Sequence, residues 1–161
     1  MVKKVQVLFI CTGNSARSQM SEGLLRKVAG DLADIYSAGT EPSDSVNPFA
    51  VKVMAENGID ISKHYPKKVD QFLGNRIDIV VTTCDGARQA CPAFPGVARS
   101  YHWDLEDPAA AEGTEEERME VFRKTFSEIS ERAIELMEVI RKMHRGEMPR
   151  EVLLGLPDLE N

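Results

Sequence analysis

The sequence predicts an α/β fold built on a mostly parallel sheet. Short apolar segments, typical of buried strands, alternate along the chain with amphipathic segments typical of helices. This alternation is typical of parallel sheets that are covered by helices. Four segments are expected to be strands: 5–10, 35–39, 78–83 and 98–103. In such a fold, the functional site lies beyond the carboxyl ends of the strands.

The first half of the chain supplies two of these strands and two helices. Residues 5–10 are apolar and partly β-branched, as expected of a buried parallel strand. The helix expected over 15–28 has apolar side chains at i+4 spacing: Ala16, Met20, Leu24 and Val28. Asn47 and Pro48 suit the N-cap and first turn of a further helix. A short helical piece is expected over 69–74.

The second half supplies two more strands and a long helix. The strand at 78–83 ends directly at Cys84. The segment 85–96 is expected to be a loop, because it contains Gly86, Pro92, Pro95 and Gly96. A helix is expected from 115 to 143, preceded by a capping box of Thr114 and Glu117.

The 161 residues suit one domain. We expect this domain to cover 1–143 and the Gly- and Pro-containing segment 144–161 to be a tail of unknown role. The formal net charge of −6 argues against a nucleic-acid or membrane-surface partner. The first apolar run ends at Ile10, too early for a signal peptide, and no stretch is long enough to span a bilayer. We expect a cytoplasmic protein and a monomer.

The stretch 11–18 joins the first strand to the first helix and is the strongest candidate site. Backbone N–H groups of this loop and of the helix N-terminus would face the space above Cys11. That arrangement binds tetrahedral oxyanions and stabilises a thiolate. The expected anion-binding residues are Thr12, Gly13, Asn14, Ser15, Ala16 and Arg17.

The neighbours of Cys11 favour a reactive thiol over a buried, inert cysteine. Gly13 permits an unusual backbone turn, and Asn14 can hold the loop through its side chain. Arg17 offers a planar fork to the oxygens of an anion. Ser18 is placed to donate a hydrogen bond to the thiolate.

A thiol that attacks an oxyanion needs an acid to protonate the departing oxygen. The segment before Pro108 offers three carboxyl groups, from Asp104, Glu106 and Asp107. Spacing alone does not choose among them, and an acidic loop ending in a proline turn is also a common structural feature.

The chain has three cysteines, and an odd number argues against a disulfide framework. Cys84 and Cys91 lie in one predicted loop, where they are either a disulfide-forming pair or two passive thiols. They make a poor zinc site, because their spacing is too long and His102 is the one histidine nearby.

Other polar and aromatic residues are expected to be structural. His64 and His102 are assigned to structural or surface positions, and Trp103 to packing beside the site. The run of Lys63, Lys67 and Lys68 is expected to be a solvated face.

Together these residues resemble the thioredoxin-coupled arsenate reductases, which share the low-molecular-weight protein tyrosine phosphatase fold. The resemblance covers residues 4–142. Its motifs are Cys-Thr-Gly-Asn-Ser-Ala-Arg-Ser and the residues after it (11–23), Ser-Ala-Gly-Thr (37–40), Asn-Pro (47–48), 58–64, Val-Thr-Thr-Cys (81–84), Cys-Pro (91–92) and His-Trp-Asp-Leu-Glu-Asp-Pro (102–108). It implies a three-layer architecture with a four-stranded parallel sheet.

The resemblance also implies a mechanism. Arsenate binds in the loop and is held by Arg17, Cys11 attacks the arsenic, and Asp107 protonates the departing oxygen. Cys84 then attacks Cys11 and releases arsenite. Cys91 attacks Cys84, and thioredoxin reduces the resulting disulfide.

Two positions depart from the family pattern. Ala16 stands where members often carry a further cysteine. Some members bind potassium through residues that match Asn14, Glu22, Ser37 and an aspartate, and Lys67 occupies the position of that aspartate. The ammonium of Lys67 can stand in for the cation, so potassium is expected to bind weakly or not at all; no other metal or cofactor is expected.

Two alternatives remain open at this stage. A low-molecular-weight phosphatase would hydrolyse phosphate monoesters with Cys11, Arg17 and Asp107 and would not use the cysteine pair. An oxyanion-sensing module would bind phosphate, sulfate or arsenate without chemistry, and it leaves Cys84 and Cys91 unexplained.

Overall fold

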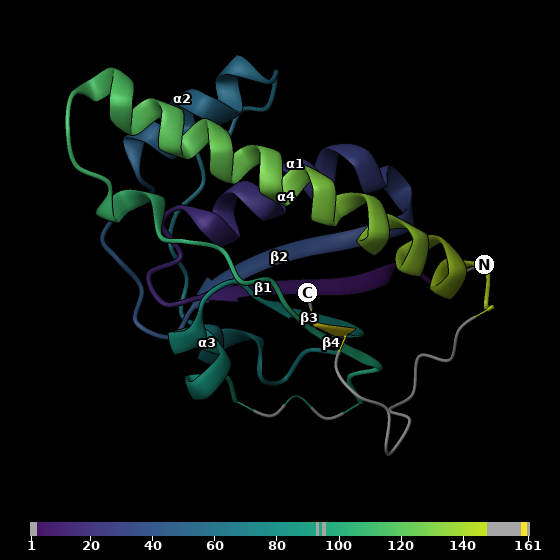
Figure 1. Ribbon diagram of the computed structural model, residues 1–161. Helices are drawn as coiled ribbons and strands as arrows, with labels where there is room; N and C mark the ends of the chain where they lie inside the picture. Colours follow the sequence, from purple (N-terminus) through teal and green to yellow (C-terminus); the bar gives the residue numbers. More distant parts are fainter. Residues whose placement is uncertain (1–2, 93, 95, 148–158, 161) are drawn as a thin grey trace.

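A parallel sheet forms the centre of the molecule in a computed structural model that describes residues 3–92, 94, 96–147 and 159–160 (Figure 1). The strand order is β2-β1-β3-β4-β5. The strands are β1 (Val5–Cys11), β2 (Ala33–Gly39), β3 (Ile79–Thr82), β4 (Arg99–His102) and β5 (Leu159–Glu160). All four neighbouring pairs are parallel. The four predicted strands are confirmed.

The two-residue strand β5 is an addition to the predicted sheet. It pairs with Tyr101 and His102 at the edge of β4. It belongs to the segment 144–161, most of which lies outside the described residues. Two residues are too short to produce a recognisable alternating pattern, which is why the sequence did not predict this strand.

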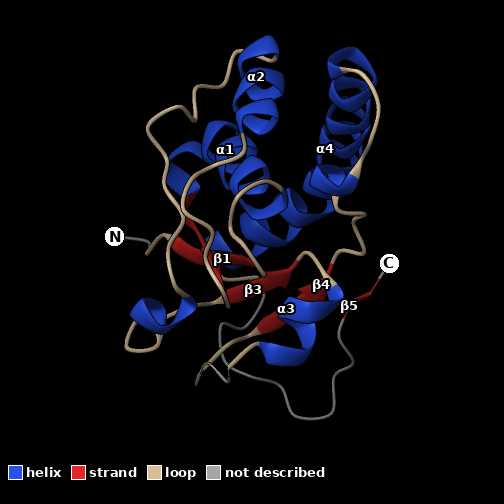
Figure 2. Cartoon of the chain, turned by 90° about the vertical axis from the view of Figure 1, so that its left-hand side faces the viewer, coloured by secondary structure: helices blue, strands red, loops and turns tan. Residues whose placement is uncertain are grey.

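Helices cover both faces of the sheet (Figure 2). On one face lie α1 (Arg17–Ala29), α2 (Pro48–Glu56) and α4 (Glu115–His144). On the opposite face lie α3 (Asp85–Ala90) and the 3₁₀-helix Val69–Phe72. The result is the three-layer α/β architecture that the resemblance implied.

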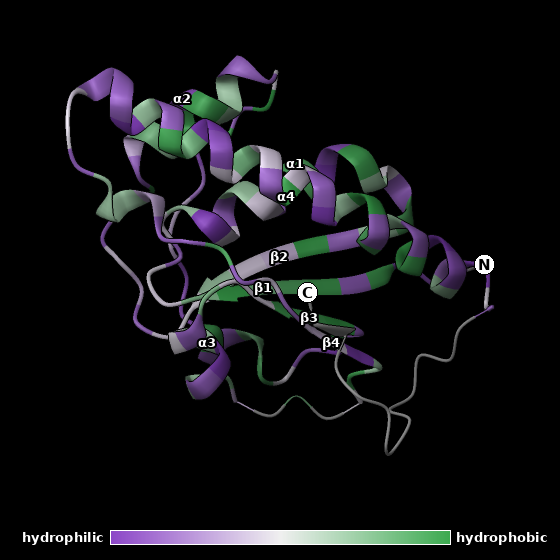
Figure 3. Cartoon of the chain, in the orientation of Figure 1, coloured by the Kyte–Doolittle hydropathy of each residue, from purple (hydrophilic) through white to green (hydrophobic). Residues whose placement is uncertain are grey.

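The apolar side chains of β1 divide between two cores because successive strand residues point to opposite faces. Val7 and Phe9 join the core beneath α1, α2 and α4. Leu8 and Ile10 join a smaller core beneath α3, with Phe72. The central strands are accordingly green, or hydrophobic, along much of their length in Figure 3. Burial on both faces explains why β1 is almost continuously apolar.

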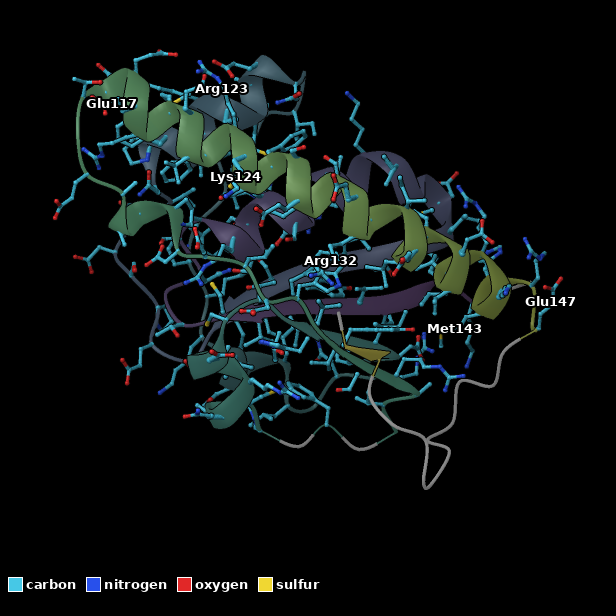
Figure 4. All side chains as sticks on the ribbon, viewed as in Figure 1. Glu117, Arg123, Lys124, Arg132, Met143 and Glu147 are labelled. Carbon is cyan, nitrogen blue, oxygen red and sulfur yellow. The ribbon has the colours of Figure 1, made fainter. Side chains whose placement is uncertain are left out.

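Helix α4 begins and packs as its sequence predicts. Thr114 is the N-cap, and its side chain and that of Glu117 form the reciprocal capping box. Within the first turns of the helix, Arg123 reaches from α4 toward α2 (Figure 4), and its Nη2 lies 2.8 Å from Glu56 Oε2. This exposed ion pair adds little stability by itself, so the buried stripe of α4 holds the helix on the sheet.

Two local predictions need correction. The segment predicted to be a loop over 85–96 begins with helix α3, whose N-cap is Cys84. The Gly and Pro residues concealed this short helix, and Pro92 lies beyond its end. Helix α1 begins at Arg17 instead of Ser15, because Ser15 and Ala16 belong to the loop above β1.

The register of the sheet brings the candidate residues to one edge. Cys11 at the end of β1 lies opposite Gly39 of β2, and Ile10 lies opposite Thr82 of β3. Thr82 in turn lies opposite His102 of β4. Residues that follow these strands therefore meet beyond their carboxyl ends. Within the described residues, no helix is long and apolar enough to cross a membrane.

Phe122 tests the importance of the buried face of α4. Its side chain is fully buried and its ring stacks on Phe49 with centroids 5.5 Å apart. We expect Phe122→Ala to lower the free energy of unfolding by about 3–5 kcal/mol in urea titrations. The control is Ile134→Ala on the same helix, whose side chain is 71% exposed. A similar loss in both variants would contradict this assignment of the core.

Candidate active site

The loop after β1 is shaped around the Cys11 sulfur. Cys11 is the last residue of β1 and is 3% exposed. Asn14 has a positive φ of 52°, and its N–H donates to Cys11 Sγ over 3.0 Å. Asparagine tolerates this left-handed conformation better than most residues. The chain therefore turns back over the sulfur at Asn14.

The predicted role of Gly13 needs correction, because the unusual turn is at Asn14. A Cβ at Gly13 would lie 2.7 Å from Ser43 Oγ, the end of an exposed side chain that can rotate away. Gly39, across from Cys11, is under a stricter constraint, since its Cβ would lie 2.5 Å from the carbonyl oxygen of Thr12. The loop is packed too closely for a side chain at Gly39.

The loop carbonyl groups are turned away from the site by the segment 40–47. The carbonyl oxygens of Cys11, Thr12, Gly13 and Ser15 accept hydrogen bonds from the N–H groups of Thr40, Glu41, Ser43 and Asn47, respectively, at 2.8–3.1 Å. In a trans peptide the N–H points opposite to the carbonyl. The N–H groups of Thr12, Gly13, Asn14 and Ala16 consequently face the other side, toward the space above Cys11. The sequence analysis did not predict that segment 40–47 binds the loop carbonyl groups. The signals for it in the sequence were the Asn47 cap and the polar residues before it.

The Ser18 hydroxyl makes a hydrogen bond with the Cys11 sulfur. The two side chains lie 2.8 Å apart, and the Asn14 Nδ2 amide donates to Ser18 Oγ over 2.8 Å. A Cys11 thiolate carries no hydrogen, so toward that form of the sulfur the Ser18 hydroxyl is the donor. Two donors, Ser18 and the Asn14 N–H, therefore stabilise negative charge on this sulfur.

The buried Asn14 side chain connects the loop to its surroundings. Its second amide hydrogen goes to Ser37 Oγ over 2.9 Å. Its Oδ1 accepts from the backbone N–H of Lys67 and from Gln19 Nε2. Every donor and acceptor of this amide is used, so its orientation and the conformation of the loop are held together.

Arg17, the first residue of α1, lies between the loop and the segment after β4. Its Nη1 donates to the Leu105 carbonyl oxygen over 3.0 Å. Its Nη2 lies 3.9 Å from Asp107 Oδ1. Of the three candidate acids, the structure thus brings Asp107 to the anion loop. Asp107 is half exposed and also caps the 3₁₀-helix Pro108–Ala110.

Cys84 lies directly beside the anion loop. Its Sγ is 3.3 Å from Thr12 Oγ1, and the Ala87 N–H donates to the same sulfur over 3.3 Å. A Cβ at Gly86 would lie 2.9 Å from Thr12 Oγ1, so the first turn of α3 packs tightly on the loop. The side chain of Cys84 is buried.

Cys91 lies at the other end of α3. Its sulfur donates to the Pro92 carbonyl oxygen over 3.4 Å, and burial raises the pKa of the thiol. The six residues of α3 lie between it and Cys84, so the two cysteines are seven residues apart, which corresponds to a rise of about 10 Å along the axis. A disulfide needs Cα atoms about 4.4–6.8 Å apart. All three cysteines are free thiols, and helix α3 holds the pair apart.

Glu22 is a buried carboxylate surrounded by basic groups behind the loop. It accepts from Ser37 Oγ over 2.7 Å, which joins it to the Asn14 network. Arg26 Nε, His64 Nδ1 and Lys67 Nζ lie 3.4, 3.5 and 3.9 Å from its oxygens. Burial lowers the pKa of Lys67, while the nearby Glu22 charge partly offsets this effect.

The position of Lys67 bears on two expectations. Lys63 and Lys68 are exposed as predicted, but Lys67 is not part of a solvated face, because its ammonium group turns in to Glu22. His64, too, is a structural neighbour of Glu22. Three basic groups around a single carboxylate leave no net negative charge to attract a metal cation. The residues at this place therefore do not fit a potassium ion.

Trp103 is a packing residue, as predicted. It is buried against Phe9, with ring centroids 5.3 Å apart.

A cysteine and an arginine on one loop, at the carboxyl edge of a parallel sheet, define the class of small cysteine-dependent phosphatases and their relatives. The profile of the low molecular weight phosphotyrosine protein phosphatase family matches residues 6–145. The chain belongs to this family.

Its relatives include several proteins named arsenate reductase. The arsenate reductase of Halalkalibacterium halodurans is 52% identical over 82% of this chain and 94% of its own. The arsenate reductase of Bacillus subtilis strain 168 is 45% identical, again over 82% of this chain and 94% of its own. The resemblance to arsenate reductases is thus confirmed.

Solved structures give the same picture. An arsenate reductase in a phosphate-binding state superposes with a TM-score of 0.74 at 32% identity, covering 84% of this chain and 98% of that one. A thioredoxin-dependent arsenate reductase of Corynebacterium glutamicum superposes with a TM-score of 0.66 at 30% identity. The match covers 87% of this chain and 63% of that one. Wzb of Vibrio vulnificus, in complex with benzylphosphonate, shares the fold at 19% identity, with a TM-score of 0.70.

Ser18→Ala tests the hydrogen bond to the Cys11 sulfur. Loss of a hydrogen bond to a charged group costs roughly 1.5–3 kcal/mol, so we expect Cys11 to be alkylated by iodoacetamide at least about tenfold more slowly at neutral pH. Peptide mass spectrometry separates Cys11 from the other thiols. Ser21→Ala is the control, since Ser21 donates to the Arg17 carbonyl oxygen and not to sulfur. Equal rates in Ser18→Ala and the parent protein would refute the contact.

His64 should make stability depend on pH. Burial lowers its pKa below the ordinary value of 6.5, and the charges of Arg26 and Lys67 act in the same direction against the effect of Glu22. The unfolded chain therefore takes up a proton first, and the free energy of unfolding falls as pH drops below about 6.5. We expect His64→Gln to reduce that loss in urea titrations between neutral and mildly acidic pH. His144→Gln, at the end of α4, is the control, and an unchanged pH profile in His64→Gln would contradict the assignment.

Proposed function

We propose that this protein is an arsenate reductase that uses its three thiols in sequence and is regenerated by thioredoxin. The observation that carries this proposal is the position of Cys84, whose sulfur lies 3.3 Å from Thr12 Oγ1 of the anion loop. Phosphate-ester hydrolysis requires only the first thiol, whereas reduction requires a second thiol within reach. The names of the relatives support the same activity.

In the first step, the inward N–H groups of the loop and Arg17 bind arsenate, and the Cys11 thiolate attacks arsenic. A sulfur–arsenic bond forms, an arsenic–oxygen bond breaks, and the oxygen leaves as water. Asp107 is suited to supply the proton, because it lies 3.9 Å from Arg17 and is half exposed. Its exposure lets it recover a proton from solvent.

In the second step, Cys84 attacks the Cys11 sulfur. The sulfur–sulfur bond forms, and the electron pair of the sulfur–arsenic bond passes to arsenic, which leaves as arsenite. Arsenic gains two electrons, and the two thiols lose them as a disulfide. The Ala87 N–H, which donates to Cys84 Sγ, stabilises the attacking thiolate.

In the third step, Cys91 attacks Cys84 and releases Cys11 as a thiolate. This step requires α3 to unwind, because the helix holds its two end cysteines too far apart. Six residues with Ala87 as the one buried side chain form a helix of low stability. Burial raises the pKa of Cys91, so this thiol becomes reactive when α3 opens and exposes it to water.

A reducing partner must then return Cys84 and Cys91 to thiols. A dithiol protein such as thioredoxin supplies the two electrons by exchange through a mixed disulfide. The thioredoxin dependence of the Corynebacterium glutamicum relative supports this partner. Three free thiols suit a reducing cytoplasm. We assign the catalytic unit to residues 1–143 and leave the tail 144–161 without a role in these steps.

Serine variants of the three cysteines test the relay. With thioredoxin, thioredoxin reductase and NADPH, we expect Cys84→Ser and Cys91→Ser to lower arsenate turnover by at least about a thousandfold. Cys91→Ser should still release a single equivalent of arsenite and accumulate a Cys11–Cys84 disulfide. Cys84→Ser should release none. Arsenite and disulfides are measured by chromatography and peptide mass spectrometry.

Hydrolysis of p-nitrophenyl phosphate is the matched control. A phosphatase reaction should be indifferent to both Cys84→Ser and Cys91→Ser and should require Cys11. Normal arsenate turnover in either variant would refute the relay. Unaltered function in Cys11→Ser would favour the oxyanion-sensing alternative.

A further inference from the structure

A second cluster of ligand-type side chains lies at the ends of β3 and β4, apart from the anion loop. It consists of Asp85 at the start of α3, His102 at the end of β4, and Asp104 two residues later. One carboxylate oxygen from each aspartate and one ring nitrogen of His102 all lie within 4.8 Å of one another. The reduction of arsenate uses none of these side chains.

A hydrogen bond holds the ring of His102 in place. Its Nδ1 lies 2.8 Å from Thr82 Oγ1. In the tautomer with hydrogen on Nδ1, Thr82 accepts this bond and the lone pair of the ring lies on Nε2. Metal-binding histidines are commonly oriented by a hydrogen bond of this kind, donated by the ring nitrogen that does not bind the metal.

The Nε2 atom faces the two carboxylates without a satisfactory partner. His102 is 6% exposed, and within the described part of the chain its Nε2 makes no hydrogen bond. Asp85 Oδ1 is only 3.2 Å away, but the geometry is not that of a hydrogen bond. A buried ring nitrogen that faces two carboxylates and makes no hydrogen bond is unfavourable. A metal ion placed between the three groups would bind all of them.

We propose that Asp85, His102 and Asp104 bind a divalent first-row transition-metal ion, of the class of Mn²⁺, Fe²⁺ or Zn²⁺. One imidazole nitrogen and two carboxylate oxygens are ligands that these ions share. Asp85 is 76% exposed, so water has access to complete the coordination shell. The aspartate side chains are exposed and free to rotate inward to bonding distance, while His102 is held in place by Thr82.

The site is distinct from the thiols, although it is close to them in sequence. Asp85 directly follows Cys84 and begins α3, whereas His102 and Asp104 belong to β4 and the segment after it. An ion bound here would join the start of α3 to the end of β4. The ligand set contains no sulfur, so oxidation of the cysteines would not remove a ligand.

Manganese binding to the reduced full-length chain tests the proposal. Mn²⁺ is the probe because it prefers oxygen and imidazole ligands to thiolates, which keeps it away from the cysteines. Electron paramagnetic resonance of free Mn²⁺ measures binding, and we expect one ion per chain. In proton NMR, Mn²⁺ should broaden the ring signals of His102 before those of His64 and His144, the other two histidines.

Variants distinguish specific coordination of Mn²⁺ by these three residues from nonspecific attraction of the ion to an acidic protein. We expect Asp85→Asn and Asp104→Asn each to raise the dissociation constant by at least about tenfold, while Glu106→Gln should match the parent protein. Glu106 is an exposed carboxylate two residues beyond Asp104 and provides the same change of charge. Amide NMR spectra check that each variant is folded.

Three results would overturn the proposal. The first is equal weakening by Asp104→Asn and Glu106→Gln, which indicates diffuse attraction. The second is simultaneous broadening of all three histidines. The third is a His102 ring that is protonated at neutral pH and unaffected by millimolar Mn²⁺, which would make the cluster an imidazolium–carboxylate pair.

Discussion

The buried amide of Asn14 is the interaction on which the site depends. It holds a left-handed residue above Cys11 and orients Ser18 toward the sulfur. It also joins the loop to Ser37 and the backbone of Lys67. A side chain with all its hydrogen bonds made inside the protein cannot rotate without leaving buried polar atoms unpaired. The anion cradle is therefore formed before substrate arrives and needs no rearrangement to receive it.

The region around α3 has the opposite property. Its six residues lie between the two later thiols, pack on Thr12 through Gly86, and bury one side chain. In the proposed relay, this helix is formed while Cys84 lies beside the loop and unwinds so that Cys91 can reach Cys84. A rigid anion loop next to a helix of low stability suits a relay in which Cys11 stays in place and Cys84 moves. Metal binding by Asp85 would act on the same helix.

The charge behind the loop is balanced within the protein. Lys67, His64 and Arg26 surround Glu22, and Glu22 is joined through Ser37 to Asn14. The ammonium group of Lys67 is thus connected to the anion loop through Glu22, Ser37 and Asn14. The two clusters differ in this respect: basic groups surround Glu22, whereas among the described residues His102 Nε2 faces two carboxylates and makes no hydrogen bond.

The sequence by itself predicted the four main strands and the helices α1, α2 and α4, because apolar periodicity and caps such as Thr114 and Asn47 are local signals. It also predicted which residues form the anion loop, since Cys11, Arg17 and Ser18 are close along the chain. Tertiary structure alone decided the rest. The position of Asp107 beside Arg17 is a contact between distant segments. The same holds for the inward turn of Lys67 to the buried Glu22 and for the hydrogen bonds from segment 40–47 that turn the loop carbonyls outward. No local pattern specifies which distant groups will meet.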